Sequence, residues 1–296
     1  MDVIKYKFVF IGLSTVLTVA AVASMIGFGY KQGIDFAGGT LWQVQFTQPV
    51  DMNSLQSFLA SQGAQDVTVR TGATANEVSI RAKEMTEDLH TSIATQMNQQ
   101  FGSFQEMSFA SIGPAIGSEL RNNALIAFVL VLLGISLYVA FAFRKVSYPV
   151  SSWKYGVATL ITLFHDALIP AGAFAFWGWK FGVEIDTNFI VALLVVMGFS
   201  VHDTIVVFDR IRENLLLSKN KENLGPIINA SVRQTFARSV NTSLTLFLVL
   251  IAMYLFGATS LSWFTLMILV GTIVGTYSSI FVASPMLTFF HRSKSK

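Results

Sequence analysis

Six long apolar segments dominate the pattern of hydrophobic and polar positions along the chain. Each is about as long as the roughly 20 residues that a helix needs to cross the hydrocarbon core of a membrane. They lie at about residues 8–29, 122–143, 155–178, 187–208, 239–257 and 262–285. The pattern therefore predicts a polytopic α-helical membrane protein with six transmembrane helices.

The first apolar segment also has an interpretation as a signal peptide. Lys5 and Lys7 precede it, and Ala21-Val22-Ala23 resembles a cleavage site. The apolar run continues through Phe28, past that site. This continuation favours a helix that stays in the protein.

The long polar stretch at residues 30–121 alternates between strand and helix patterns. Its strand-like segments contain Thr40–Phe46, Val67–Val69, Val78–Ile80 and Met107–Phe109. Asp51 and Thr86 can each cap a helix whose apolar residues follow at helical spacing. The order of elements predicts a small α+β domain (βαββαβ, ferredoxin-like). Such a fold hosts many functions and says little about activity.

Basic residues predict the orientation in the membrane. The cytoplasmic side of a membrane protein is enriched in Lys and Arg. With six crossings, one side collects Lys5, Lys7, Arg144, Lys145, Lys154, Arg210, Arg212, Lys219, Lys221, Arg233, Arg292, Lys294 and Lys296. Both termini are therefore expected in the cytoplasm.

The expected domains follow from this orientation. Residues 1–29 form the cytoplasmic N-terminus and first helix, and residues 30–121 the extracytoplasmic domain. Residues 122–288 form the other five helices, and residues 289–296 a cytoplasmic tail. A basic, amphipathic loop at about 209–237 either lies along the membrane surface or simply connects two helices.

Composition supports a membrane protein and excludes several kinds of site. The chain is 53% hydrophobic and 12% charged, whereas soluble domains carry about 25% charged residues. It has no cysteine, which excludes disulfides and Cys-ligated metal sites. The glycine-rich segment Gly33–Gly39 lacks the Lys-Ser/Thr of a P-loop and is expected to turn the chain into the first strand. We expect no enzyme activity, cofactor, metal or nucleic-acid partner.

Two ionisable residues at membrane depth are candidate functional residues. Such residues cost about 2.5–3.5 kcal/mol each on insertion scales, so they mark possible sites. Asp203 and Arg238 lie at comparable depth and could meet across a helix pair. Such a site can gain and lose a proton as helices move. The alternatives are a static buried ion pair, or an Arg238 that reaches the headgroups.

His165 and Asp166 lie near the middle of the third apolar segment and are further candidates for a proton relay. Neighbouring residues point about 100° apart on a helix, so they are not expected to pair with each other. One of them could instead face a polar neighbour such as Asn241. A packed polar pair is the alternative. His202 adjoins Asp203 but projects elsewhere.

Several polar residues near these candidates have expected structural roles. Asp209, Arg210, Arg212 and Glu213 are interpreted as charges at the end of a helix. Gly271 and Gly275 have GxxxG spacing and are expected to allow close helix packing.

An ordered series of motifs resembles the SecD/SecF family, and in particular its SecF members. The motifs are Gly33–Thr40, Gly113–Pro114 with Gly117 and Glu119–Leu120, Phe164–Asp166, Ser200–Asn214, Arg238–Ser243 and Gly275–Ser279. The family's proton-relay aspartate matches Asp203 and its functional arginine matches Arg238. One departure is His202, where the family commonly has Asn, and this histidine could add a proton carrier.

The resemblance implies membership of the resistance–nodulation–division superfamily. It implies that the chain pairs with SecD and associates with the SecYEG channel and YajC in the bacterial inner membrane. There it would use the proton-motive force to complete export of unfolded preprotein. The alternatives are a proton-driven small-molecule transporter of the same superfamily and a purely structural partner of SecD.

Overall fold

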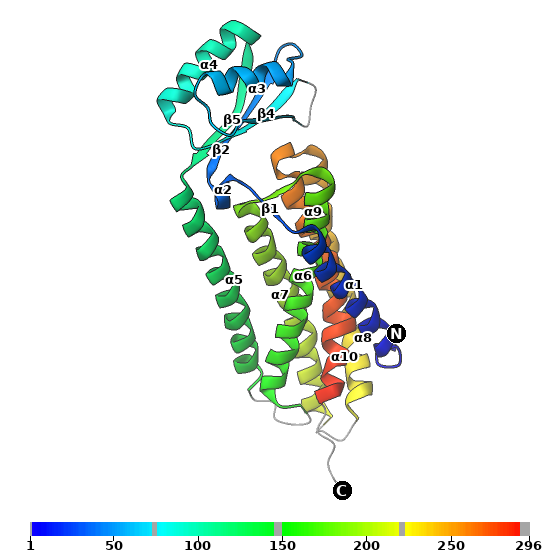
Figure 1. Ribbon diagram of the computed structural model, residues 1–296. Coiled ribbons are helices and arrows are strands. Elements are labelled where there is room, and N and C mark those ends of the chain that lie inside the picture. The colour runs from blue at the N-terminus through cyan, green and yellow to red at the C-terminus, as the bar shows by residue number, and fades with distance from the viewer. Residues whose placement is uncertain (1, 73–75, 145–149, 219–222, 291–296) are drawn as a thin grey trace. The chain divides into compact units, whose positions relative to one another are not determined.

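The computed structural model describes residues 2–72, 76–144, 150–218 and 223–290. The chain divides into two compact units (Figure 1). One unit contains residues 1–31, 126–183 and 188–296, and is helical. The other contains residues 32–125 and 184–187, and combines a sheet with helices.

Six long apolar helical segments confirm the six predicted spans. Five are single helices: α1 (Lys7–Phe28), α5 (Pro114–Ala142), α6 (Ser152–Phe181), α7 (Thr187–Leu217) and α8 (Leu224–Phe256). The sixth, Thr259–Phe290, contains α9 (Ser262–Ser278) and then a π-helix, η2 (Ser279–Ala283). It ends in α10 (Ser284–Met286) and the 3₁₀ turn η3 (Leu287–Phe290).

Helix α6 is the most buried span of the helical unit, and α1 packs closely against it. A Cβ added to Gly172 of α6 would lie 2.5 Å from the Ala21 Cα atom of α1. Ser24 donates a hydrogen bond to the carbonyl oxygen of Gly172 across the same contact, over 2.8 Å. Helix α1 thus packs into the bundle, whereas its retention as an uncleaved helix stays a prediction.

Helices α7 and α9 also meet through small residues. A Cβ added to Gly271 would lie 2.2 Å from the Val196 side chain, and one added to Gly275 would lie 3.0 Å from that of Ser200. The expected role of this glycine pair in close packing is confirmed.

The predicted surface loop at residues 209–237 is instead two helix ends. Helix α7 continues to Leu217 and α8 begins at Leu224, while Lys219 and Lys221 lie outside the described residues. Some apolar side chains of this stretch are buried in protein, for example Ile211 and Val232, whereas Leu216 and Leu217 are exposed. An apolar stripe can face a neighbouring helix as well as a membrane surface, so the location of this stretch along the membrane stays a prediction.

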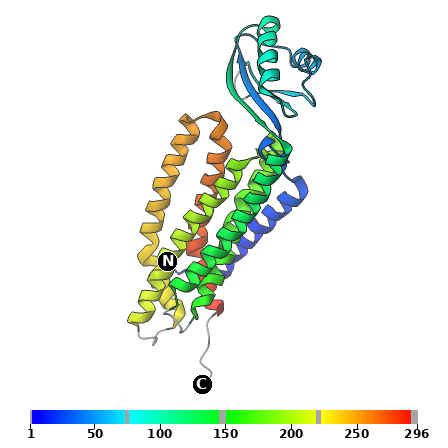
Figure 2. The same ribbon diagram turned by 90° about the vertical axis from the view of Figure 1, so that its left-hand side faces the viewer.

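The second unit contains a four-stranded antiparallel sheet. Its strands are β2 (Gly39–Phe46), β3 (Thr68–Thr71), β4 (Glu77–Ala82) and β5 (Phe104–Ile112), in the order β3-β4-β2-β5. Helices α3 (Met52–Ser61) and α4 (Glu87–Phe101) lie on one face of the sheet (Figures 1 and 2). The predicted strand and helix order is confirmed, whereas the ferredoxin-like classification stays a prediction.

The core of this unit lies between the sheet and its two helices. Trp42 and Ile80 from the strands and Leu59 and Ile93 from the helices are fully buried. Both predicted caps are present: the side chains of Asp51 and Thr86 accept the backbone N–H groups of Ser54 and Leu89. Alternating strand residues and amphipathic helices thus bury their apolar sides against each other.

The glycine-rich segment forms the expected turn into the first long strand. It contains the short helix α2 (Ile34–Ala37), after which Gly38 and Gly39 have φ angles of 75° and 115°. A Cβ at Gly38 would lie 2.8 Å from the Pro114 Cα atom, so the backbones here approach too closely for a side chain. These positions need glycine for both conformation and space.

Two short strands, β1 (Lys31–Gln32) and β6 (Glu184–Ile185), pair beside this turn. Asp35 accepts hydrogen bonds from the backbone nitrogen and side-chain hydroxyl of Thr187, over 2.9 and 2.5 Å. Thr187 is the first residue of α7. Asp35 therefore satisfies a backbone N–H that the helix itself leaves unpaired.

Candidate functional site

Asp166 is a fully buried carboxylate in the middle of α6, with three polar neighbours. Ser278 of α9 donates to its Oδ2 atom over 2.6 Å, and Ser200 of α7 donates to the same oxygen. His165 Nδ1 lies 2.8 Å from the Oδ1 atom. Three helices thus supply the hydrogen bonds that a buried carboxylate needs.

The contact between His165 and Asp166 contradicts the prediction that these neighbours do not pair. The separation of about 100° applies to the Cα–Cβ bonds. Rotation of the histidine side chain can still bring Nδ1 back to the neighbouring carboxylate. The other ring nitrogen, Nε2, is buried and has no hydrogen-bond partner among the described residues.

Asp203 is the second buried carboxylate of the helical unit, with 4% of its surface exposed. It accepts a hydrogen bond from Ser279. Asp203 follows Ser200 by three residues, so both lie on one face of α7. That face also carries Val196 toward α9, where Gly271 leaves room for it.

Ser278 and Ser279 connect the two carboxylates through one short stretch of backbone. Ser278 ends α9 and Ser279 begins the π-helix. The first bonds to Asp166 on α6 and the second to Asp203 on α7. Isolated π turns within α-helices occur frequently at functional sites.

Sequence reasoning did not single out these serines as site residues. The available signal was their position within the motif Gly275–Ser279, next to two small glycines in an apolar span. Hydroxyl groups there need partners, and buried carboxylates are the strongest acceptors nearby.

The expected meeting of Asp203 and Arg238 is absent from the structure. Arg238 lies on an exposed face of α8, and in the described part of the chain it forms no ion pair with Asp203. His202 is also exposed, which agrees with the prediction that it projects away from Asp203. Similar depth along two helices does not fix which way their side chains point.

Helix α8 carries polar residues on its exposed face within the membrane span. Arg238, Asn241, Thr242 and Thr245 recur at helical spacing and are all exposed. Helix α8 lies at one edge of the helical unit (Figure 2), where it packs against α9. The suggested contact of Asn241 with His165 or Asp166 is therefore not formed.

The charges at the end of α7 behave as expected. Arg210 contacts Glu213 over 2.5 Å and Arg212 contacts Asp209 over 2.7 Å, both as neighbours one helical turn apart. Such partly exposed pairs three residues apart on a helix contribute about 0.2–0.5 kcal/mol each. They are helix-end electrostatics rather than a chemical site.

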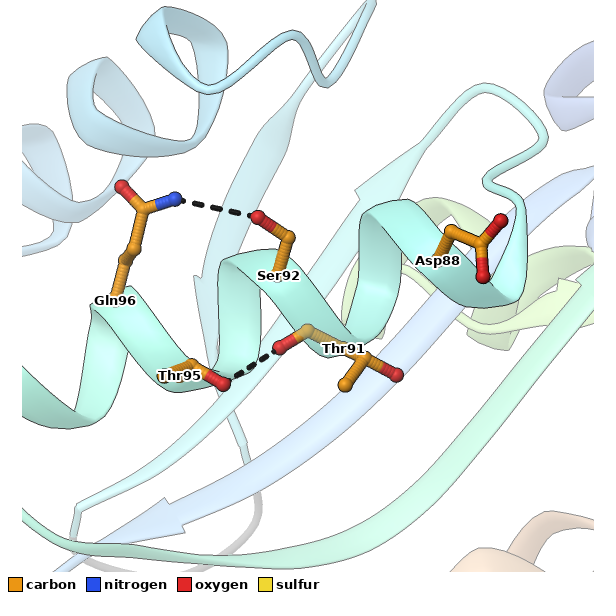
Figure 3. Close-up of a pocket in the computed structure, with 5 residues that line it drawn as sticks. All are labelled: Asp88, Thr91, Ser92, Thr95 and Gln96. Atoms are coloured by element: carbon orange, nitrogen blue, oxygen red, sulfur yellow. Dashed lines mark hydrogen bonds between the residues drawn. The ribbon is translucent and has the colours of Figure 1, made fainter.

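The second unit has a shallow polar pocket on the outer face of α4 (Figure 3). It is lined by Asp88, Thr91, Ser92, Thr95 and Gln96. Thr95 donates to the Thr91 carbonyl oxygen and Gln96 to the Ser92 hydroxyl (Figure 3). These hydroxyl and amide groups can donate or accept hydrogen bonds without requiring a charge on the partner. The residues that the structure describes contain no cluster of side chains able to hold a metal ion.

Comparison with known families accounts for this architecture. A family model described as "Protein export membrane protein SecD/SecF, C-terminal" matches residues 92–293, and one for the SecD/SecF GG motif matches residues 23–50. The chain belongs to the SecD/SecF family. With its six apolar helices it is a multi-pass membrane protein of that family.

Relatives in this family resemble the chain over nearly its whole length. The protein translocase subunit SecF of Thermobaculum terrenum is 43% identical over 97% of this chain and 93% of the relative. The SecF of Pseudomonas aeruginosa is 34% identical over 94% of this chain and 88% of the relative.

Solved structures of SecDF show the same fold. SecDF from Thermus thermophilus matches with a TM-score of 0.80 and 31% identity over 98% of this chain. The chain spans only 38% of that longer protein. A second SecDF structure, in a super-membrane-facing form, matches with a TM-score of 0.68 and 32% identity.

Proposed function

We propose that this chain is a SecF-type subunit of the Sec protein-export machinery and works with SecD. In this role it uses the proton-motive force to complete translocation of unfolded preprotein across the bacterial inner membrane. It is a transport component rather than an enzyme. The names of its relatives, protein translocase subunit SecF, support this role.

The observation that carries the proton-driven part is the pair of buried carboxylates, Asp166 and Asp203, in membrane-spanning helices. Ionisable groups at that depth are costly and mark ion pathways. One charge moving through about 100 mV releases about 2.3 kcal/mol, which is close to the cost of placing one such residue in a membrane. A proton gradient can therefore drive a rearrangement of these helices.

The proposed roles follow from where each side chain lies. Asp203 is the principal proton carrier, and Asp166 with His165 forms the second group of the relay. Arg238 and His202 are exposed, so both can reach groups on a neighbouring subunit. SecD, which carries a similar six-helix unit by family resemblance, is the proposed neighbour, and SecYEG and YajC are proposed associates.

Basic residues gathered at one end of the helical unit support the proposed cytoplasmic location of both termini. The Lys7 ammonium donates to the Thr288 hydroxyl over 3.0 Å, and Lys154 donates to the Phe290 carbonyl oxygen over 2.9 Å. The start of α1, the start of α6 and the end of the last span therefore share one basic end. The residues of the tail, Arg292, Lys294 and Lys296, lie outside the described residues.

The second unit is the proposed extracytoplasmic domain that holds the emerging preprotein. An unfolded chain presents many peptide groups and a variable charge. The hydroxyl and amide groups of Thr91, Ser92, Thr95 and Gln96 suit such a partner because they bond to peptide groups of any sequence.

The decisive test replaces Asp203 with Asn. The variant is first shown to accumulate with SecD, and preprotein export is then measured in membrane vesicles with and without a proton gradient. We expect the gradient-dependent part of export to vanish while ATP-driven export and assembly persist. If export keeps its full response to the gradient, the result would instead support the alternative that the chain is a purely structural partner of SecD. Gradient-driven transport of a small molecule in place of preprotein would favour the transporter alternative.

A further inference from the structure

Ser278 and Ser279 each have two hydrogen-bond acceptors within reach. Besides Asp166, the Ser278 hydroxyl lies 3.1 Å from the carbonyl oxygen of Gly275. Besides Asp203, the Ser279 hydroxyl lies 3.0 Å from the carbonyl oxygen of Thr276. A hydroxyl has a single proton to donate, so each serine chooses between a carboxylate and its own helix backbone.

We propose that Ser278 and Ser279 are positioning residues that transmit the protonation state of Asp166 and Asp203 to the backbone at the junction of α9 and the π-helix. The proposal rests on the proposed function, because it names the part of the protein that responds when these carboxylates bind a proton.

The choice of acceptor changes with the carboxylate. An ionised carboxylate is the stronger acceptor, so each serine donates to it. A protonated carboxyl group can instead donate its own proton to the serine oxygen. The serine proton then turns to the carbonyl oxygen three residues earlier. The added proton stays on the carboxyl group, and no covalent bond changes.

The backbone at the junction is suited to respond to this change. The Gly275 carbonyl oxygen already accepts the backbone N–H of Ser279, so a second donor from Ser278 competes for it. On the other side, the side-chain hydroxyl of Ser284 donates to the Ser279 carbonyl oxygen, five residues earlier. Helical hydrogen bonding changes from α to π at this point. A change in which groups donate hydrogen bonds here can move the boundary between α and π geometry. The end of the span after Ser279 would then shift.

Few titratable side chains other than the two carboxylates surround Ser278 and Ser279. Among the described residues, the buried titratable side chains of the helical unit are Tyr155, His165, Asp166 and Asp203. His202 on α7 and Arg238 on α8 are exposed. Helix α9 contributes Tyr277, whose hydroxyl donates to the carbonyl oxygen of Phe10 on α1. The serines therefore report mainly on the two carboxylates and His165.

The test is infrared difference spectroscopy of the full chain with SecD in lipid vesicles, recorded as the pH is lowered. The carboxyl band that disappears in Asp203→Asn identifies Asp203. We expect Ser279→Ala to move this band to higher wavenumber and to remove the amide change that accompanies it. Ser278→Ala should act in the same way on the band that disappears in Asp166→Asn.

Two further variants control for a general effect on folding. Ser239 is a buried serine of α8 whose hydroxyl has no hydrogen-bond partner in the described part of the chain, so Ser239→Ala should leave both bands unchanged. Ser279→Thr keeps the hydroxyl and should give the wild-type spectrum. If Ser279→Ala fails to accumulate, Ser279→Cys replaces it as the test variant, because a thiol is a much weaker donor than a hydroxyl.

The outcomes separate this proposal from the proposed function. Wild-type carboxyl and amide changes in Ser278→Ala and Ser279→Ala would overturn the serine proposal. If Asp203→Asn still abolishes gradient-dependent export in that case, the proposed function stands. If Asp203→Asn exports normally, the proposed function fails whatever the serines do.

Discussion

At the residue scale, the buried carboxylates of the helical unit accept hydrogen bonds from serines on neighbouring helical segments. Asp203 accepts from a serine hydroxyl, and Asp166 accepts from two serine hydroxyls with the His165 ring beside it; among the described residues neither pairs with an arginine or a lysine. A neutral donor satisfies a carboxylate without trapping it in an ion pair. Such a carboxylate can therefore take up a proton without first breaking an ion pair to an arginine.

Asp51 provides a prediction for the second unit at the same scale. Its carboxylate accepts the Ser54 hydroxyl over 2.6 Å and the Ser54 backbone N–H over 2.9 Å. These bonds lower the pKa of Asp51 below its ordinary value of 3.8. The stability from this cap is therefore complete above about pH 4 and is lost as the pH falls through the lower folded pKa.

The expected result for Asp51→Asn is a cap that no longer depends on pH. Thermal unfolding of the full chain, followed between pH 2 and 5, should show a smaller loss of stability on acidification than in the wild type. Asp66, which pairs with the exposed Lys83, gives a matched control through Asp66→Asn. An unchanged acid response in Asp51→Asn would show that this cap does not titrate with unfolding.

At the element scale, contact between spans depends on small residues rather than on apolar bulk. Lipid is as apolar as leucine, so apolar side chains alone give membrane helices little reason to associate. Gly172 allows α1 to reach α6, and Gly271 and Gly275 allow α9 to reach α7. The second of these contacts brings Ser278 and Ser279 to the carboxylates. Close helix packing is therefore a condition for the candidate site.

Gly172→Ala should separate α1 from α6. The added methyl group would lie 2.5 Å from Ala21 Cα, which is backbone and cannot rotate away. Overpacking of this kind costs about 1–3 kcal/mol, so the thermal stability of the detergent-solubilised protein should fall. Gly12→Ala on α1 meets nothing within 4 Å and should cause no loss. Equal stability of the two variants would contradict the contact.

At the scale of the whole molecule, the polar face of α8 indicates a further subunit. Arg238, Asn241, Thr242 and Thr245 are exposed within a span that is long and apolar enough to cross a membrane. Polar groups that face lipid are unfavourable, whereas the same groups can hydrogen-bond across a helix interface. The proposed occupant of this face is the six-helix unit of SecD.

Cross-linking can test this interface because the chain has no cysteine of its own. Thr245→Cys should form a cross-link to SecD in membranes with a short thiol-reactive reagent. Val240→Cys, which lies on the opposite side of α8 and lines a groove toward α9, should give at least tenfold less product. Equal yields of cross-linked product from the two variants would show that SecD does not bind at the polar face of α8.

Local pattern alone predicted most of the helices and strands of this protein. Apolar length predicts all six spans, because each must satisfy its own backbone within a membrane. Alternation, helical spacing and the caps Asp51 and Thr86 predict the strands and helices of the second unit. The order of motifs is enough to recognise the family. These features depend on neighbours close in the sequence.

Tertiary structure decided which side chains meet. Asp203 was expected to meet Arg238 and instead accepts from Ser279, and His165 was expected to avoid Asp166 but contacts it. The helix rotation that orients each side chain is set by small residues such as Gly271 and Gly275 on a neighbouring span. Depth along a helix can be counted from the sequence. The direction in which a side chain points into the bundle depends on packing between helices far apart in the chain.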